Sequence, residues 1–413
     1  MSRRLAVIGA GPIGLEMARF ASAAGFDIRV YEAATIGGNL TAVRDVPLFT
    51  PFEMNSTVEA RASLRRAGAT LPPDDALLTA GELVSRCLLP MASLPELRGR
   101  IEEQTRVTAV GRDDLTKAKE IVATGATGRA ERPFILRLET PGGSRLAAAD
   151  IVIDASGTLS HPLATGPGGI PAIGEDALGD RFDRHLLPTR GATRSRFEGR
   201  RVLLIGCGYS AATALTDFET LARERAGPAR VDWVLRDRGN MVFDQEPDDP
   251  LPARSALGRV ANGIAARAPW LTRHAGCVIQ AYERVEDGST LVRLRTPAGR
   301  EKSLTVDRVY SLAGYRPDVD LFRELQIHLC YASEGPMALA SAILAARATN
   351  PVQIRDCLAQ KTHGPETLRT TEPNFYVIGA KSYGRNPGFF LRLGFQQIRE
   401  VALLLPCAAP VAG

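Results

Sequence analysis

The sequence lacks any pair of cysteines spaced as C-x-x-C. The 413 residues include six cysteines, all at isolated positions: Cys87, Cys207, Cys277, Cys330, Cys357 and Cys407. This spacing excludes a zinc knuckle and a redox-active dithiol, and it argues against a secreted framework of disulfides. We therefore expect free thiols in a protein of the reducing cytoplasm.

Signs of a metal site, a nucleic-acid surface or a membrane span are also missing. The arginines are scattered and aromatic residues make up only 6%, so the net charge of +5 does not indicate nucleic acid as a partner. The apolar stretches at the two ends are too short or too interrupted to cross a bilayer or to act as a signal peptide. The histidines have no paired spacing that would suit a metal: they are His161, His185, His274, His328 and His363.

Alternating strands and helices fill a chain that is long enough for two or three domains. The pattern predicts two βαβ units, one over 4–31 and one over 201–235, and hence an α/β fold with two dinucleotide-binding domains. The first unit has its strand, helix and strand at 4–8, 12–24 and 27–31, and the second begins at Arg201 and continues at 210–225 and 231–235. Other predicted elements are helices at 81–104 and 388–405 and strands at 106–110, 132–140, 145–157, 290–312 and 375–380.

The first Gly-x-Gly turn lies in "RLAVIGAGPIG", where a strand runs into a helix that opens with Pro12 and Ile13. Gly9 allows the tight turn, Gly11 lets a pyrophosphate approach the backbone, and Gly14 lets helix and strand pack closely. Glu32 ends the next strand, about 20 residues on, where a carboxylate would accept ribose hydroxyls. Its charge would repel a 2′-phosphate, so this half is predicted to hold FAD or NAD rather than NADP.

The second turn lies in "RVLLIGCGYSA" and has Gly206, Gly208 and Ser210, with Ala211 following. Its third glycine is replaced by Ala212 or displaced by the small residues around it. Arg236 and Arg238 follow the next strand, and guanidinium groups suit a 2′-phosphate. Asp237 between them keeps NADH as an alternative. The two turns therefore predict two different dinucleotides, FAD first and NADPH second.

With both turns present, the chain resembles the class B flavin monooxygenases, over most of its length apart from 240–285 and 317–371. The resemblance is carried by these stretches: Glu32 to Leu40 with Gly38 and Asn39, Met54 to Thr57, Thr105 to Val107, Asp154 to Gly157 with Ser156, Leu312 to Asp318 with Gly314, and Phe375 to Ala380 with Gly379. It implies that Asn55 lies beside the flavin ring as a catalytic residue and that the backbone at Val107 reaches the adenine. Apart from the resemblance, the helix expected near Gly388 is placed to direct its N-terminus at the flavin and to stabilise negative charge on the reduced ring; the alternative is that it only caps the first domain.

One family signature is incomplete, because the Phe-Gly-His sequence before the second turn keeps Phe182 and His185 but not the glycine. The expected function is an NADPH-dependent FAD monooxygenase that transfers one atom of molecular oxygen to a small organic substrate. The alternative is an FAD-dependent reductase that inserts no oxygen. A non-catalytic nucleotide sensor is disfavoured because both glycine turns are largely intact.

The domain boundaries follow from the same motifs and from a Gly/Pro-rich stretch at 165–175. We expect an FAD-binding domain at 1–160 and 372–413 and an NAD(P)H-binding domain at 161–316. The remaining 317–371 is expected to be a mostly helical insertion that covers the substrate pocket.

Overall fold

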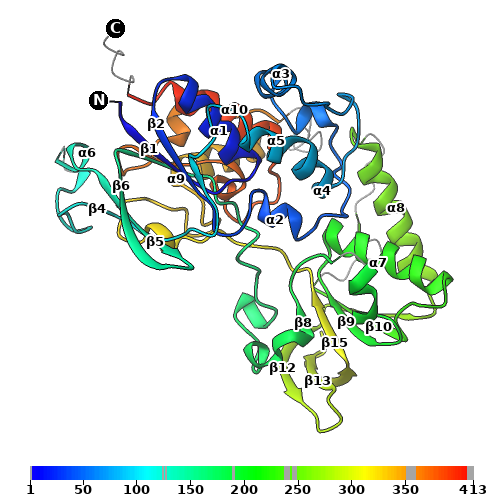
Figure 1. Ribbon diagram of the computed structural model, residues 1–413. Helices are drawn as coiled ribbons and strands as arrows, with labels where there is room; N and C mark the ends of the chain where they lie inside the picture. Colours follow the sequence, from blue (N-terminus) through cyan, green and yellow to red (C-terminus); the bar gives the residue numbers. More distant parts are fainter. Residues whose placement is uncertain are drawn as a thin grey trace. The chain divides into compact units, whose positions relative to one another are not determined.

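The computed structural model describes residues 2–122, 125, 128–187, 191–236, 242–243, 249–349 and 360–406. The chain divides into two units, one formed by Met1–His161 with Arg316–Gly413 and the other by Pro162–Tyr315 (Figure 1). Each unit contains a five-stranded sheet and a three-stranded sheet, with helices packed on them. The predicted α/β class is confirmed.

The large sheet of the first unit is parallel and has the strand order β16-β7-β1-β2-β3. Its strands are β1 (Arg4–Ile8), β2 (Asp27–Tyr31), β3 (Ile101–Glu102), β7 (Ile151–Asp154) and β16 (Phe375–Val377). Helix α1 (Pro12–Ala23) connects β1 to β2, and Val7 pairs in register with Val30 and Ile153. The first βαβ unit therefore forms where the sequence predicts it.

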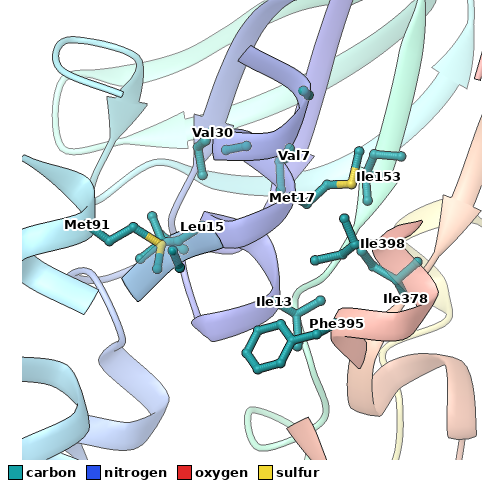
Figure 2. Packing of buried hydrophobic residues seen from close by; sticks show 14 of the residues in the cluster. Val7, Ile13, Leu15, Met17, Val30, Met91, Ile153, Ile378, Phe395 and Ile398 are labelled. Atoms are coloured by element: carbon teal, nitrogen blue, oxygen red, sulfur yellow. The ribbon is translucent and has the colours of Figure 1, made fainter. Parts of the chain in front are cut away.

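Both faces of this sheet are buried, which explains why β1 is apolar at consecutive positions. On one face Val7 and Ile153 pack against α1 and against α10 (Leu391–Ala402), as the labelled side chains in Figure 2 show. On the other face Ile8 and Val152 pack against the antiparallel sheet β4-β5-β6. That sheet is formed by β4 (Arg106–Arg112), β5 (Phe134–Thr140) and β6 (Gly143–Ala149).

The helix predicted at 81–104 is shorter than expected. It consists of α4 (Ala80–Leu83), a π-helical turn η2 (Val84–Leu88) and α5 (Leu89–Ala92). Pro90 has no N–H to donate to the preceding turn, and Pro95 disfavours helical backbone at Leu94, so the helix ends and β3 follows. The other helices in this part of the chain are α2 (Gly38–Thr41), α3 (Val58–Arg66) and the short α6 (Gly128–Glu131), which lies beside β4 and β6 (Figure 1).

The segment 317–371 is not mostly helical in the residues that are described. Its helical parts are η7 (Asp320–Phe322), α9 (Met337–Thr349) and η8 (Pro365–Leu368), and loops connect them. Leu339 packs into the core on the helical side of the sheet, and Phe322 packs into the core on the other side. This segment is therefore part of the first unit's core, and its role as a substrate cover stays a prediction.

The second unit repeats this plan with the parallel strand order β11-β10-β9-β15-β8 and an antiparallel sheet β12-β13-β14. Helix α7 (Tyr209–Arg223) connects β9 to β10, as the sequence predicts, and α7 packs against α8. The element bounds are β8 (Phe182–Asp183), β9 (Arg201–Ile205), β10 (Arg230–Leu235), α8 (Pro252–Arg267), β11 (Leu271–Ala275), β12 (Val278–Arg284), β13 (Thr290–Arg295), β14 (Glu301–Val306) and β15 (Arg308–Ser311).

An ion pair at the start of the first strand is repeated in both units. Arg4 donates its backbone N–H to Asp150, and the guanidinium Nη2 lies 2.7 Å from Asp150 Oδ1. Arg201 makes the same two contacts with Asp307, again with 2.7 Å between Nη2 and Oδ1. In each unit the aspartate directly precedes the strand beside the first one, so the pair fixes the register of these two strands.

A buried charge cluster links the antiparallel sheet of the first unit to the chain before β16. The carboxylate of Glu372 accepts from Arg112 Nε at 2.8 Å and from Arg129 Nη2 at 2.9 Å, and all three side chains have no exposed area. The backbone N–H of Gln326 donates to the same carboxylate. Two buried guanidinium groups thus depend on one acid.

Replacing this acid should destabilise the protein strongly. We expect Glu372→Gln to lower the free energy of unfolding by about 3–5 kcal/mol, because two buried cations lose their counter-ion. Urea denaturation, monitored by circular dichroism, measures the free energy of unfolding. The control Glu366→Gln, which removes an exposed acid from the same stretch of chain, should cost less than about 0.5 kcal/mol. Equal losses of stability in the two variants would refute the role of Glu372 as the counter-ion of both arginines.

Candidate functional site

The first glycine turn is built on close backbone contacts. Gly9 has φ +99°, and its N–H donates to the Tyr31 carbonyl at 2.8 Å. A Cβ on Gly9 would lie 2.9 Å from Ser156 Cα, and one on Gly14 would lie 1.9 Å from the Gly9 carbonyl oxygen. A Cβ on Gly11 would have no atom within 4 Å. Gly9 and Gly14 are thus required for packing, whereas Gly11 leaves its backbone open.

A cavity of about 290 Å³ lies at this turn, where β1 gives way to α1. Of the predicted site residues, it is lined by Gly9, Gly11, Pro12, Ile13, Glu32, Gly38, Asn39, Leu40, Ser156, Gly157, Gly379 and Ala380. These residues come from four separate stretches of the chain. Phe389 and Leu391, near the start of α10, also line it, as do Gly37, Ala155, Thr158 and Leu159.

A smaller cavity of about 120 Å³ shares Gly9, Glu32, Asn39 and Ser156 with the first. It also includes Tyr31 and Val107, the residue predicted to lie near an adenine. Burial, followed by the charge of Glu102, raises the pKa of Tyr31, so its phenol stays protonated. The shared wall makes the two cavities neighbours along the edge of the sheet.

Glu32 is held at the shared wall by two backbone N–H groups. Its Oε2 accepts from Ala10 at 2.8 Å, and its Oε1 accepts from Ala34 at 2.9 Å. The Ala10 contact ties the carboxylate directly to the glycine turn. A carboxylate oxygen has a second lone pair, so Glu32 can still accept hydroxyl groups from a molecule in the cavities.

Asn55 does not line either cavity. Its side chain is buried, Nδ2 donates to the carbonyls of Thr50 and Pro51, and Oδ1 accepts from the Thr50 hydroxyl at 2.8 Å. The amide is therefore used within its own loop. Its catalytic role stays a prediction.

The closing motif brings β16 and the start of α10 to the larger cavity. After β16 the chain makes a helical turn, η9 (Gly379–Tyr383), and the Gly379 N–H donates to Gln397 Oε1 at 2.8 Å. Helix α10 begins at Leu391, later than the predicted 388, after Pro387 and Gly388. Gln397 is a buried residue of α10 that the sequence analysis did not identify, since its partner is 18 residues away.

The second unit has a matching turn. Gly206 has φ +122°, and a Cβ there would lie 2.3 Å from the Leu312 carbonyl oxygen, while Gly208 is open like Gly11. Ala211 follows Gly206 by the same five residues that separate Gly14 from Gly9, so Ala211, and not Ala212, takes the third position. Its methyl group is fully buried. Ser210 lies in the first turn of α7, and Gly314 has φ +97° after β15.

Beyond this turn, Arg236 is exposed directly after β10, and Arg238 lies outside the described residues. Trp233 is buried in β10 and donates its indole N–H to the Gly206 carbonyl at 2.8 Å. Its ring stacks on Phe243 with the centroids 5.9 Å apart. Trp233 thus holds the second turn in place, a role that the sequence analysis missed because the partner lies 27 residues away, in the turn after β9.

The incomplete signature residues also lie in the second unit. Phe182 is in β8, beside β15, and His185 stacks on Tyr315 with ring centroids 5.6 Å apart. His185 Nδ1 is 3.2 Å from the Tyr315 hydroxyl. Burial, followed by the charge of Arg184, lowers the pKa of His185, so its imidazole is neutral at pH 7.

The described cysteines are free thiols, three of them buried (Cys87, Cys277 and Cys330) and one exposed (Cys207, in the second turn). Burial raises the pKa of Cys87 to about 12, which keeps it protonated and unreactive. Among the described residues, no group of three or more His, Cys, Asp or Glu side chains could hold a metal ion. No helix in the described ranges has the length and apolarity needed to span a membrane.

Several solved structures share this fold. Bacillithiol disulfide reductase Bdr (YpdA) from Bacillus cereus matches with a TM-score of 0.65 and 16% identity, covering 97% of this chain and 98% of its own. The cadaverine monooxygenase DfoA from Erwinia amylovora matches with 0.61 and 14%, covering 99% and 96%. The ornithine N-hydroxylase KtzI from Kutzneria sp. 744 matches with 0.60 and 15%, covering 98% of each chain.

No family model and no curated protein matches the sequence. The structural likeness covers nearly the whole chain, so it shows that the chain has the α/β fold with two dinucleotide-binding-type units. The matching structures include both reductases and monooxygenases.

The two kinds of glycine in the first turn should respond differently to the same substitution. Gly14→Ala should lower the free energy of unfolding by about 1–3 kcal/mol, because the new methyl group collides with the Gly9 carbonyl. Gly11→Ala should leave stability within about 0.5 kcal/mol of wild type, because its methyl group enters open space. Urea denaturation of ligand-free protein compares them, and a reversed order would contradict this account of the turn.

Proposed function

We propose that the protein is an oxidoreductase that holds FAD in its first unit and takes electrons from NADPH bound by its second unit. The main support is the convergence of the Gly9 turn, Glu32 and the closing motif on one cavity. Two structures of similar fold are described with these cofactors: DfoA bound to FAD, and KtzI with reduced FAD and NADP⁺.

The residues of the first unit suit FAD. Gly11 leaves the backbone open at the start of α1, where free N–H groups and the helix dipole favour a pyrophosphate. Glu32 supplies acceptors for ribose hydroxyls, and the cavity that includes Val107 suits an adenine. The flavin, when bound, would accept a hydride and pass electrons on. The chain's part is to bind and orient it.

The second unit suits a nicotinamide dinucleotide by the same argument. Gly208 is open at the N-terminus of the 15-residue helix α7. No acid stands where the first unit has Glu32, and the exposed Arg236 there favours the 2′-phosphate of NADPH over NADH.

Monooxygenation is our preferred reaction, with a small organic substrate and molecular oxygen as partners. It is supported by the resemblance in the sequence motifs and by the likeness to DfoA and KtzI. The second candidate, a reductase without oxygen insertion, is supported by the likeness to Bdr and by the incomplete Phe-Gly-His signature. Dithiol chemistry is disfavoured because the sequence has no C-x-x-C.

The free thiols suit a cytoplasmic location.

Removing the acceptor at the shared wall should weaken flavin binding. We expect Glu32→Ala to raise the Kd for FAD at least about tenfold, because charged hydrogen bonds to ribose hydroxyls are lost. Titration of ligand-free protein with FAD, monitored by flavin fluorescence, measures this Kd. Glu53→Ala, at an exposed acid outside both cavities, serves as the control and should bind FAD like wild type.

The reaction itself is tested with labelled oxygen. Purified protein should be yellow, and under nitrogen NADPH should bleach it faster than NADH does. With ¹⁸O₂ and a screen of amines, thioethers and ketones, a monooxygenase should give a product that contains the label. Label found only in peroxide or water would favour the reductase instead, and a colourless protein that binds no FAD would refute both.

A further inference from the structure

Lys381 is a fully buried lysine just behind the wall of the larger cavity. It lies in η9, directly after Gly379 and Ala380, which line that cavity, and 1% of the residue is exposed. Its Nζ is 2.6 Å from Asp154 Oδ2 and donates to Ser156 Oγ at 3.1 Å. The same ammonium lies 5.3 Å from the centre of the Phe322 ring. The cation is thus enclosed between an acid, a hydroxyl and an aromatic face.

The contacts of Lys381 converge on Ser156. Asp154 Oδ1 accepts from the Ser156 N–H at 3.1 Å and from its hydroxyl at 2.6 Å, so both hydrogen-bond donors of Ser156 are directed at Asp154. Ser156 lines both cavities, and its Cα is the atom that a Cβ on Gly9 would meet. The Lys381–Asp154 pair therefore fixes the position of the wall against which the glycine turn packs.

The second unit shows that the fold does not need this pair. Asp154 pairs in register with Ile8, the last residue of β1, and Ser311 pairs in the same way with Ile205, the last residue of β9. Ser311 is buried too, but it is neutral. The same close turn is built there without a charged strand end. Burying two charges costs solvation that a neutral pair avoids, so stability alone does not explain the pair.

We propose that Lys381 is a positioning residue that makes the first unit a tight site for its dinucleotide. This inference rests on the proposed function, because it requires FAD in that unit. The lysine holds Ser156 in place and cancels the charge of Asp154 beneath a site that receives a doubly negative pyrophosphate. Glu32 is the one acid that lines the larger cavity, and no lysine or arginine lines it among the described residues. Lys381 is therefore the cation that balances the negative charge of Asp154.

The test uses full-length variants Lys381→Met and Lys381→Gln, the double variant Asp154→Asn with Lys381→Gln, and the control Lys361→Met, which changes an exposed lysine of the same unit. The measurements are the Kd for FAD and the midpoint potential of the bound flavin. We expect both single variants at Lys381 to bind FAD about tenfold or more weakly and to shift the potential to a more negative value, because Asp154 is left uncompensated. The double variant should recover most of the affinity, and the control should match wild type.

Two results separate this inference from the proposed function. If wild type binds FAD and the folded Lys381 variants keep its Kd and its potential, the inference is wrong even where their melting temperature falls. If Lys381→Met does not fold, the Kd for FAD and the flavin potential of Lys381→Gln, whose side chain can still hydrogen-bond Ser156, serve as the test. Wild-type protein that binds no FAD would instead refute the proposed function, and the inference with it.

Discussion

The structure depends on one steric constraint, the contact of a backbone turn with the end of the neighbouring strand. Gly9 meets Ala155 and Ser156, and Gly206 meets Leu312, at distances that leave no room for a side chain. This contact lets each helix begin directly at the sheet, so its free N–H groups face the edge where the strands end. The cavity of the first unit, the placement of Glu32 and the packing of α1 on β1 all follow from it.

What the sequence predicts well is what neighbouring residues determine. The strands at 4–8 and 27–31, the helix between them and the placement of Glu32 follow from apolar runs and glycine spacing. The helix at 81–104 is overpredicted because Pro90 and Pro95 act against an otherwise apolar pattern. Lys381 and Trp233 could not be assigned, because their partners lie at the ends of other strands and are brought close only by folding. For Lys381 and Ser156 the separation is 225 residues.

The two units share one scaffold and differ in charge at corresponding positions. Both have the glycine turn, the Arg–Asp pair that sets the strand register and the antiparallel sheet beside the parallel one. They differ at the end of the second strand, where the first unit has Glu32 and the second has Arg236, and at the strand beside the turn, where Asp154 corresponds to Ser311. The shared features make the turn. Of the differing residues in the first unit, Glu32 lines both cavities and Asp154 is buried behind their wall.

The first unit is assembled from the two ends of the chain, with β16 completing a sheet whose other strands all lie before residue 155. On the ribosome, the N-terminal strands emerge long before β16, α10 and Lys381 have been translated. Asp154 therefore lacks its partner Lys381 while the whole second unit, 162–315, is being made. Part of the wall of the larger cavity, including Gly379, Ala380 and Leu391, is thus supplied only after the second unit has been translated.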